Sequence, residues 1–375
     1  MSVFADFHAL QSVPVANLNR DDLGSPKSVK YGNASRLRVS SQSWKRVIRH
    51  GVEADLGEKA ARTRLVPVKV AEKLRDQDWP EDLAAFAGAQ VAASASAKKP
   101  LKVEQAGHTS VLLFLPESGI EELTTLCTLH REALEKGLGK KNPGALLPPA
   151  HVEEILKRRT ASISLLGRML AELPGANVDG AAQVAHAFTT HAAEPQRDYF
   201  TAVDDWLPSD ATGSGHLNTA EFGAGVFYRF ASVNLTDLIT NLDGDAKAAR
   251  TVLASFAEQF LMSLPQAKKN STAPHTVPDL AYLAVRRHRP LSLAAAFETP
   301  VRADNAGGFS GPSRQALAAY ARGIHRLTAD AHRPFHGHAA VSGNTLEGIG
   351  EEHPSFAGLI EATVDAALTA HGSRP

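Results

Sequence analysis

The sequence has very little cysteine and few aromatic residues. Of 375 residues only Cys127 is a cysteine, and Phe, Trp and Tyr together make up 6%. A single cysteine excludes a disulfide framework and a structural zinc site built on cysteines, and it fits a reducing compartment. The core must therefore rest on aliphatic residues and alanine. The length corresponds to about two and a half domains of roughly 150 residues, which is enough to bury a sizeable core.

Long apolar runs are also missing. No stretch approaches the roughly 18 consecutive apolar residues that a membrane-spanning helix needs. Asp6 and His8 interrupt the first apolar segment, where a signal peptide would carry only apolar residues. We therefore expect a soluble, cytoplasmic protein that does not contact a membrane.

Motifs of the common enzyme classes are absent as well. There is no HExxH, GxSxG, Walker P-loop or GxGxxG pattern. His186 and His191 are five positions apart on an expected strand, and an odd spacing places two side chains on opposite faces of a strand. We therefore expect core or hydrogen-bonded histidines rather than metal ligands. Adjacent Asp21 and Asp22 lack a third ligand and are expected to cap a turn or pair with Arg20. A catalytic acid pair is the alternative; we expect no enzyme, no metal and no cofactor.

Charge is balanced over the chain but not along it. There are 40 basic and 40 acidic residues in total. Between positions 20 and 49, however, eight basic residues face only two acidic ones, the basic ones being Arg20, Lys27, Lys30, Arg36, Arg38, Lys45, Arg46 and Arg49. This local excess predicts an anionic partner.

The stretch 40–49 (SSQSWKRVIR) predicts the start of a helix. Ser41 is a suitable N-cap, and Trp44 and Ile48 belong to an apolar stripe at helical spacing. Free backbone N–H groups at a helix start favour phosphates, and cations one turn apart share a face. The candidate phosphate ligands here are Ser40, Gln42, Lys45, Arg46 and Arg49. The alternative is a capped surface helix with solvated basic side chains.

The remaining pattern predicts an α+β protein. Residues 3–13, 183–191, 225–234 and 280–285 are expected to be strands, with helices after the first and third of them. A short strand at 37–40 should precede the first helix, and 161–166 reads as a further buried strand. The β-α-β-β-α-β order is that of ferredoxin-like folds, which RRM domains use to bind single-stranded RNA.

Four regions follow from this order. We expect an RRM-like domain at 1–55, 160–191 and 225–290, an inserted helical lobe at 56–159, a long protruding hairpin-like flap at 192–224, and a mainly helical segment at 291–375 that packs on the domain or the lobe. The flap carries the apolar residues Tyr199, Phe200, Val203, Trp206 and Leu217. They either pack the flap on its own domain or contact unstacked bases or a neighbouring subunit.

Six short segments together carry a family resemblance. They are 18–22 (LNRDD), 38–43 (RVSSQS), 167–169 (GRM), 186–191 (HAFTTH), 200–205 (FTAVDD) and 225–229 (GVFYR). The sequence resembles the CasC-type backbone subunit of the type I-E CRISPR Cascade complex, a repeat-associated member of the RRM-like superfamily. The resemblance covers about residues 1–50 and 160–300.

The resemblance implies a non-catalytic protein of CRISPR antiviral defence. It also implies a right-hand shape, in which the RRM-like domain is the palm, the helical lobe at 56–159 is the fingers and the flap at 192–224 is the thumb. Copies would stack head-to-tail along the guide RNA (crRNA) into a helical filament, and the thumb would kink the guide at regular intervals. The implied partners are the crRNA, further copies of the chain, target DNA paired to the guide, and the large, small, 5′-end cap and repeat-processing subunits.

The resemblance also implies which residues contact RNA. The start of the first helix would hold phosphates, with Arg49 where a lysine is familiar, while Met169 and Leu217 would pack at the kinked nucleotide. The full candidate set is Arg20, Lys27, Arg38, Ser40, Gln42, Lys45, Arg46, Arg49, Arg168, Met169, Phe200, Leu217 and Lys268. Two alternatives stay open: a metal-dependent endoribonuclease of the same superfamily that depends on Asp22, and an RNA-binding metabolic regulator or scaffold.

Overall fold

The computed structural model describes residues 2–96, 100–104, 106–170, 172–202, 206, 216–328, 332–341 and 346–372. The chain divides into two compact units. The first comprises 1–51, 182–239 and 245–375, and the second comprises 52–181 and 240–244. Helix α1 (Ser41–Asp55) begins in the first unit and ends in the second.

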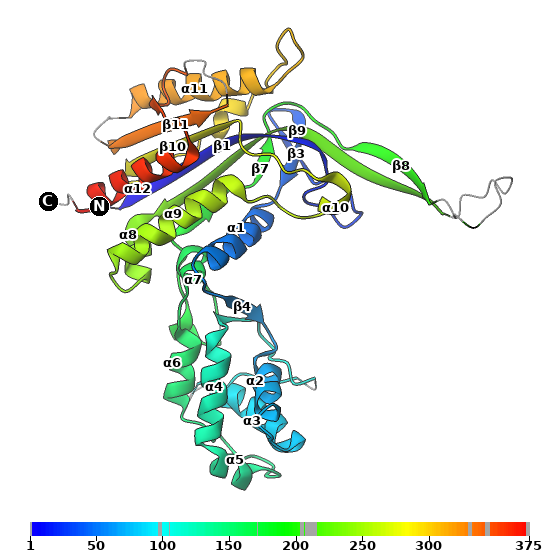
Figure 1. The fold of residues 1–375 in the computed structure, drawn as a ribbon, viewed down its shortest axis with the longest axis vertical. Helices are drawn as coiled ribbons and strands as arrows, with labels where there is room; N and C mark the ends of the chain where they lie inside the picture. Colours follow the sequence, from blue (N-terminus) through cyan, green and yellow to red (C-terminus); the bar gives the residue numbers. More distant parts are fainter. Residues whose placement is uncertain are drawn as a thin grey trace. The chain divides into compact units, whose positions relative to one another are not determined.

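The first unit is built on one large sheet (Figure 1). Its strand order is β12-β11-β10-β1-β9-β7-β3-β2. The strands are β1 (Val3–Ala16), β2 (Ser28–Tyr31), β3 (Ala34–Val39), β7 (Ala187–Thr189), β9 (His216–Asn234), β10 (Leu280–Arg287), β11 (Phe335–Ala340) and β12 (Glu351–Glu352). Two further strands, β6 (Ala182–Val184) and β8 (Gln196–Ala202), pair with β9 beside this path.

The middle of this sheet has the predicted ferredoxin-like order. Strands β10, β1, β9 and β7 are neighbours in that sequence, and each neighbouring pair is antiparallel. They correspond to the fourth, first, third and second strands of the β-α-β-β-α-β pattern. The α+β fold class is therefore confirmed. The predicted strand 183–191 is split into β6 and β7, because the chain leaves the ladder near His186.

Apolar residues on both faces make β1 a central strand. Phe7 packs against Phe256 of helix α9 (Ala246–Met262), with ring centroids 5.5 Å apart. On the opposite face His8 stacks on Tyr282, in the direction of the cluster that includes Leu317 of α11 (Ser310–Leu327). Helix α12 (Phe356–Gly372) lies on the α9 side, where Arg250 and Asp365 pair at 2.5 Å. Helices thus cover both faces of the sheet.

Strands β8 and β9 form the hairpin predicted as the thumb, and Figure 1 shows it projecting from the sheet. Strand β9 starts at residue 216, earlier than the predicted 225, so the hairpin continues directly into the central sheet. Val203 lies outside the described residues.

One sequence-based expectation is wrong. Residues 161–166 form helix α7 (Ala161–Leu166), not a strand. The Thr160 hydroxyl accepts the Ile163 N–H at the start of the helix, and Gly167 ends it with a φ of 80°. A six-residue apolar run alone fits a strand or a helix equally well, and these two caps favour the helix. The C-terminal segment contains α11 and α12, and its strands β11 and β12 extend the sheet beyond β10.

Short helices connect these strands in the first unit. Helix α8 (Leu235–Asn241) begins where the Asn234 Oδ1 atom accepts the Thr236 N–H at 3.1 Å. The others are α10 (Lys269–Thr272) and the 3₁₀ turn η2 (Ala294–Phe297).

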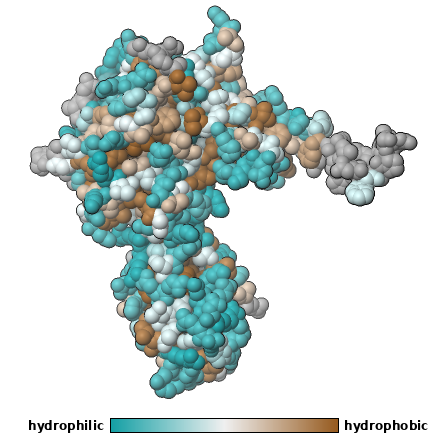
Figure 2. Space-filling view, in the orientation of Figure 1, coloured by the Kyte–Doolittle hydropathy of each residue, from teal (hydrophilic) through white to brown (hydrophobic). Residues whose placement is uncertain are grey.

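The second unit is mostly helical. It contains α2 (Val66–Arg75), α3 (Glu81–Ala93), α4 (Ser118–Leu129), α5 (Arg131–Gly137), α6 (Pro149–Lys157), α7, the 3₁₀ turn η1 (Pro174–Ala176) and a two-stranded sheet of β4 (Ala60–Thr63) and β5 (Leu113–Pro116). In the view of Figure 2 its surface is mainly hydrophilic. It extends beyond the predicted insertion 56–159 at both ends.

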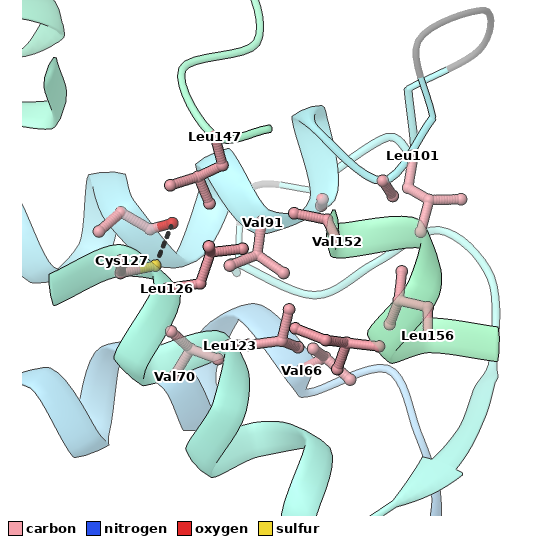
Figure 3. Packing of buried hydrophobic residues seen from close by; sticks show 14 of the residues in the cluster. Val66, Val70, Val91, Leu101, Leu123, Leu126, Cys127, Leu147, Val152 and Leu156 are labelled. Atoms are coloured by element: carbon pink, nitrogen blue, oxygen red, sulfur yellow. Dashed lines mark hydrogen bonds between the residues drawn. The ribbon is translucent and has the colours of Figure 1, made fainter. Parts of the chain in front are cut away.

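Aliphatic side chains fill the core of this unit (Figure 3). Val70, Leu123 and Val152 are fully buried within it. The Cys127 S–H donates to the Ala87 carbonyl at 3.9 Å, and burial raises the pKa of this thiol to about 12. The single cysteine is therefore a protonated core residue. Within the described ranges, no helix combines the length and apolarity needed to cross a membrane.

Candidate nucleic-acid interface

Helix α1 starts one residue earlier than predicted. Ser40, not Ser41, is the N-cap, since its Oγ atom accepts the Ser43 N–H at 3.4 Å. The Ser40 N–H itself donates to Asn19 Oδ1 at 2.8 Å, which ties the helix start to the loop that follows β1. This loop carries the predicted contact Arg20, so the two candidate elements are held together at the helix N-terminus.

His186 provides a second tie. Its Nδ1 atom accepts the Ser41 N–H at 3.1 Å and lies 3.3 Å from the Arg38 guanidinium. Partial burial, then the charges of Arg38 and Lys27, lower the pKa of His186. The ring therefore stays neutral at pH 7 and can accept the amide proton. His186 is hydrogen-bonded as predicted, and so is His191, whose Nε2 accepts the Val226 N–H at 3.1 Å.

The two faces of α1 differ as the sequence predicts. Trp44 and Ile48 are buried against the first unit, whereas Gln42 and Arg46 are exposed. Lys45 and Arg49 are partly buried on the outer side, and Arg49 contacts the Nε2 atom of His50 at 3.2 Å. Four of the predicted phosphate ligands are thus available at or near the surface of one helix.

One cavity lies beside α1, and a second is lined by the loop that follows β1. The first, of about 840 Å³, has Ser43, Arg46 and His50 of α1 on one side and residues 262–267 and 275–277 on the other. The second, of about 420 Å³, brings together Arg20, Phe200 and Lys268, which come from three separate parts of the sequence. Arg197 of β8 adds a further cation, paired with Glu221 at 3.2 Å.

The residues that line the two cavities are adjacent in the sequence at two places. Leu18, Gln266 and Ala267 line the first, and Asn17, Arg20 and Lys268 line the second. We call this pair of cavities the basic groove, with Arg20, Arg46, Arg197 and Lys268 as its cations. Lys27 and Arg38 line a small adjoining hollow with Leu18 and Asn19.

The backbone at Lys268 is in the left-handed region. Its φ is 56°, and Ala273, at the other end of α10, has a φ of 41°. Residues with a Cβ rarely adopt this conformation, and where they do the strain commonly marks a functional position. The strained turn holds an exposed Lys268 at the edge of the groove.

Asp21 has the structural role predicted for it. Its Oδ1 atom accepts the N–H groups of Leu23 and Ser25, both at 2.9 Å. The carboxylate thus shapes the turn that carries Arg20. Among the described residues, no group of three or more His, Cys, Asp and Glu side chains could hold a metal ion.

Arg168 is not among the residues that line the basic groove. Arg168 belongs to the second unit and is buried, and its guanidinium donates to the carbonyls of Ala176, Phe114, Arg158 and Lys157 at 2.7 to 3.0 Å. Desolvation lowers its pKa to about 10, so it stays charged. With its donors bound to backbone carbonyls, Arg168 orders its own unit, which argues against the predicted RNA contact.

Other predicted apolar contacts are only partly placed. Met169, also in the second unit, is 86% exposed, and Phe200 is 48% exposed on β8. The side chain of Leu217 lies outside the described residues.

Arg36, counted in the basic window, is fully buried and donates to the carbonyls of Thr189, Phe297 and Glu298. The groove therefore has fewer cations from this window than the sequence indicates.

Sequence reasoning missed Arg197 and Arg229. Arg197 lies in the thumb, where we weighed only apolar residues. Arg229 is a buried member of an apolar strand, and no local pattern distinguishes a structural arginine there. Its alternation with Tyr228 and Phe230 along β9 indicates only that it lies on the α9 face of the sheet.

The fold and the groove define an α+β protein with a ferredoxin-like sheet, a hairpin extension and a cationic surface suited to a polyanion. Residues 5–361 match the family described as CT1975-like protein, and the chain belongs to this family. It is similar to a solved chain of a "CRISPR RNA-guided surveillance complex, pre-nicking", with 46% identity, a TM-score of 0.93 and coverage of 97% of this chain and 100% of that chain.

A second solved chain, from a "CRISPR RNA-guided surveillance complex", is 42% identical with a TM-score of 0.82. The match covers 97% of this chain and 99% of that one. No curated protein matches the sequence. The family resemblance is thus confirmed at the level of the surveillance complex, while type I-E stays a prediction.

Proposed function

We propose that this chain is a non-catalytic crRNA-binding subunit that forms the backbone of a Cascade-type surveillance complex. Copies would assemble head-to-tail along the guide, kink it at regular intervals and present it for pairing with target DNA in antiviral defence. The similarity to chains of RNA-guided complexes over nearly the whole length supports the assignment. The type I-E subtype and a cytoplasmic location are part of this proposal.

The observation that carries the proposal is the basic groove. Arg20, Arg46 and Lys268 reach it from three chain segments and can bind successive phosphates of one strand. Phosphate contacts position a strand but do not read its sequence. A subunit that repeats along any guide needs this property, because base pairing with the target reads the sequence.

The thumb supplies contacts of a second kind. Tyr199, Phe200 and Trp206 are 67%, 48% and 96% exposed. Aromatic side chains stack on unpaired bases or pack on another protein. These residues are suited to the guide and to a neighbouring copy, and the remaining surfaces would contact the large, small, 5′-end cap and repeat-processing subunits.

The endoribonuclease alternative has less support. It would need carboxylates that are free to bind metal, whereas Asp21 is engaged by two backbone amides of its own turn. Incubation of guide-length RNA with the protein and Mg²⁺ or Mn²⁺ tests the point directly. We expect intact RNA, and cleavage that is lost in Asp22→Ala would instead support the nuclease.

The proposal is tested by native mass spectrometry of the protein, mildly tagged and purified from its own host. We expect a particle with several copies of the chain and one RNA of repeat-plus-spacer length. A monomer without RNA would contradict the proposal.

A further inference from the structure

Arg229 is a buried arginine at the centre of the first unit. It lies on β9, is only 2% exposed, and donates through one terminal nitrogen to Gln11 Oε1 of β1 at 2.5 Å. The other terminal nitrogen donates to the carbonyl of Phe260 on α9. Gln11 in turn donates from Nε2 to the Thr276 carbonyl at 2.7 Å.

Two aromatic rings enclose the same guanidinium. Its central carbon lies 3.8 Å from the ring centroid of Trp44 and 4.7 Å from that of Phe260. Trp44 is the buried anchor of α1. Such cation–π stacking needs the flat guanidinium, because a lysine ammonium cannot stack on two rings and bond two oxygens in this way.

No carboxylate of the described residues forms an ion pair with this guanidinium. Within the described part of the chain Arg229 has no ion pair, and burial alone lowers its pKa to about 9, so the charge persists at pH 7. A buried charge without a counter-ion is costly, and apolar packing of the same volume is often at least as stable. Stability alone is therefore a poor explanation for an arginine here.

The contacts of Arg229 lead to the walls of the first cavity of the basic groove. Trp44 lies one residue from Ser43 and two from Arg46, which line one wall. Phe260 lies two residues before Met262, where the opposite wall begins, and Thr276 is itself a lining residue. One guanidinium thus connects α1, the end of α9 and the 275–277 segment beneath this cavity.

We infer that Arg229 is a positioning residue of the RNA groove. By fixing Trp44 against the end of α9 and, through Gln11, against Thr276, it sets the distance between Arg46 and the facing wall. It contacts no RNA itself. This inference rests on the proposed function, since it assigns a device to the same groove.

The experiment measures binding of a fluorescein-labelled oligouridylate to the full-length protein as a function of salt. In Arg229→Lys and Arg229→Met we expect affinity to fall about tenfold, the scale of coupling between packed neighbours. The slope of log affinity against log salt should fall by about one, because Arg46 loses its phosphate. Trp44→Phe changes the α1 side of the contact with the Arg229 guanidinium and keeps Arg229 itself. It should also lower both the affinity and the salt slope.

Phe256→Leu is the matched control. Phe256 is buried on the same helix as Phe260 and packs on Phe7, but it is not one of the two rings that contact the Arg229 guanidinium. It should lower the melting temperature without changing the salt slope. A role of Arg229 in stability alone predicts that all these variants behave like Phe256→Leu, and that result would overturn the inference.

Double-mutant cycles separate the two cavities. The effects of Arg229→Lys and Arg46→Ala on affinity should be far from additive, because both remove the same contact, whereas those of Arg229→Lys and Arg20→Ala should add. Additivity with Arg46→Ala would also overturn the inference. Absence of RNA binding by the wild-type protein would instead contradict the proposed function, so the two failures are distinguishable.

Discussion

Asp6 and Arg286 form a buried ion pair between neighbouring strands, with 3.0 Å between Arg286 Nε and Asp6 Oδ2. The same Asp6 oxygen accepts the Leu291 N–H at 2.8 Å. Despite these partners, burial raises the pKa of Asp6 to about 6, because desolvation outweighs the attraction of Arg286. The two partners therefore differ in how they can respond when the other is removed.

Asp6→Asn should destabilise the protein strongly. It leaves Arg286 as an uncompensated buried charge that cannot be neutralised, at a cost of roughly 3 kcal/mol or more. Arg286→Met should cost less, because the Asp6 carboxyl can take up a proton. The loss of stability caused by Arg286→Met should be larger at about pH 8 than at about pH 5, because protonating the Asp6 carboxyl costs more free energy at the higher pH. Urea denaturation at both values measures this, and equal costs at the two would refute the argument.

Buried histidines should make the fold sensitive to acid. Burial lowers the pKa of His8 well below 6.5, and burial followed by Arg333 lowers that of His325 to about 3. The unfolded chain then binds more protons below about pH 6.5, so stability should fall as the pH decreases. Asp6 has the opposite effect: its pKa is higher in the folded chain than in the unfolded one, so its protonation stabilises the fold as the pH falls between those two values. The protons that the unfolded chain binds at His8 are enough to cancel this gain in stability.

The test is the urea midpoint between about pH 7.5 and about pH 5. His8→Phe keeps a ring against Tyr282 and Phe230 and removes one titrating group, so its midpoint should fall less steeply than that of the wild type. A midpoint that rises on acidification would show that Asp6 dominates.

The order of the central strands could be predicted because each carries its own local signal. Short runs of apolar residues identify β1, β9 and β10, and the Asn234 and Asp245 caps mark the starts of the helices that follow β9. The start of α1 was predictable to one residue, because Ser40 and Ser41 are both suitable caps. These signals lie within a few residues of the structure that they determine.

Arg168 and Arg36 show what the sequence does not reveal. Both look like surface cations, yet each is buried and binds backbone carbonyls of distant segments. Which arginine turns inward depends on loops that meet only in the folded chain. For the same reason the meeting of Arg20, Phe200 and Lys268 in one cavity could not be derived from their spacing.

At Lys268 the effect of backbone strain on stability can be measured separately from the effect of charge on RNA binding. Lys268→Gly should leave stability unchanged or raise it by up to about 1 kcal/mol, because glycine adopts the left-handed conformation without penalty. The lost charge should weaken oligouridylate binding several-fold and lower the salt slope by about one. Ala273→Gly relieves a similar conformation without changing charge, so it should affect stability alone. Equal losses of affinity in both variants would show that the turn geometry matters, not the ammonium group.

Charge reversal on α1 should weaken RNA binding regardless of sequence. Lys45→Glu combined with Arg49→Glu places two carboxylates on α1 beside Arg46, at two partly buried positions that were predicted to bind phosphates. We expect at least about a tenfold loss of affinity at low salt, equal for oligouridylate and oligoadenylate, because phosphate contacts do not read bases. Lys140→Glu with Lys141→Glu makes the same change in net charge at two exposed positions of the second unit and serves as the control. If the α1 variant retained full affinity, or lost it for only one of the two RNAs, the site would not lie on this helix face as a phosphate-binding surface.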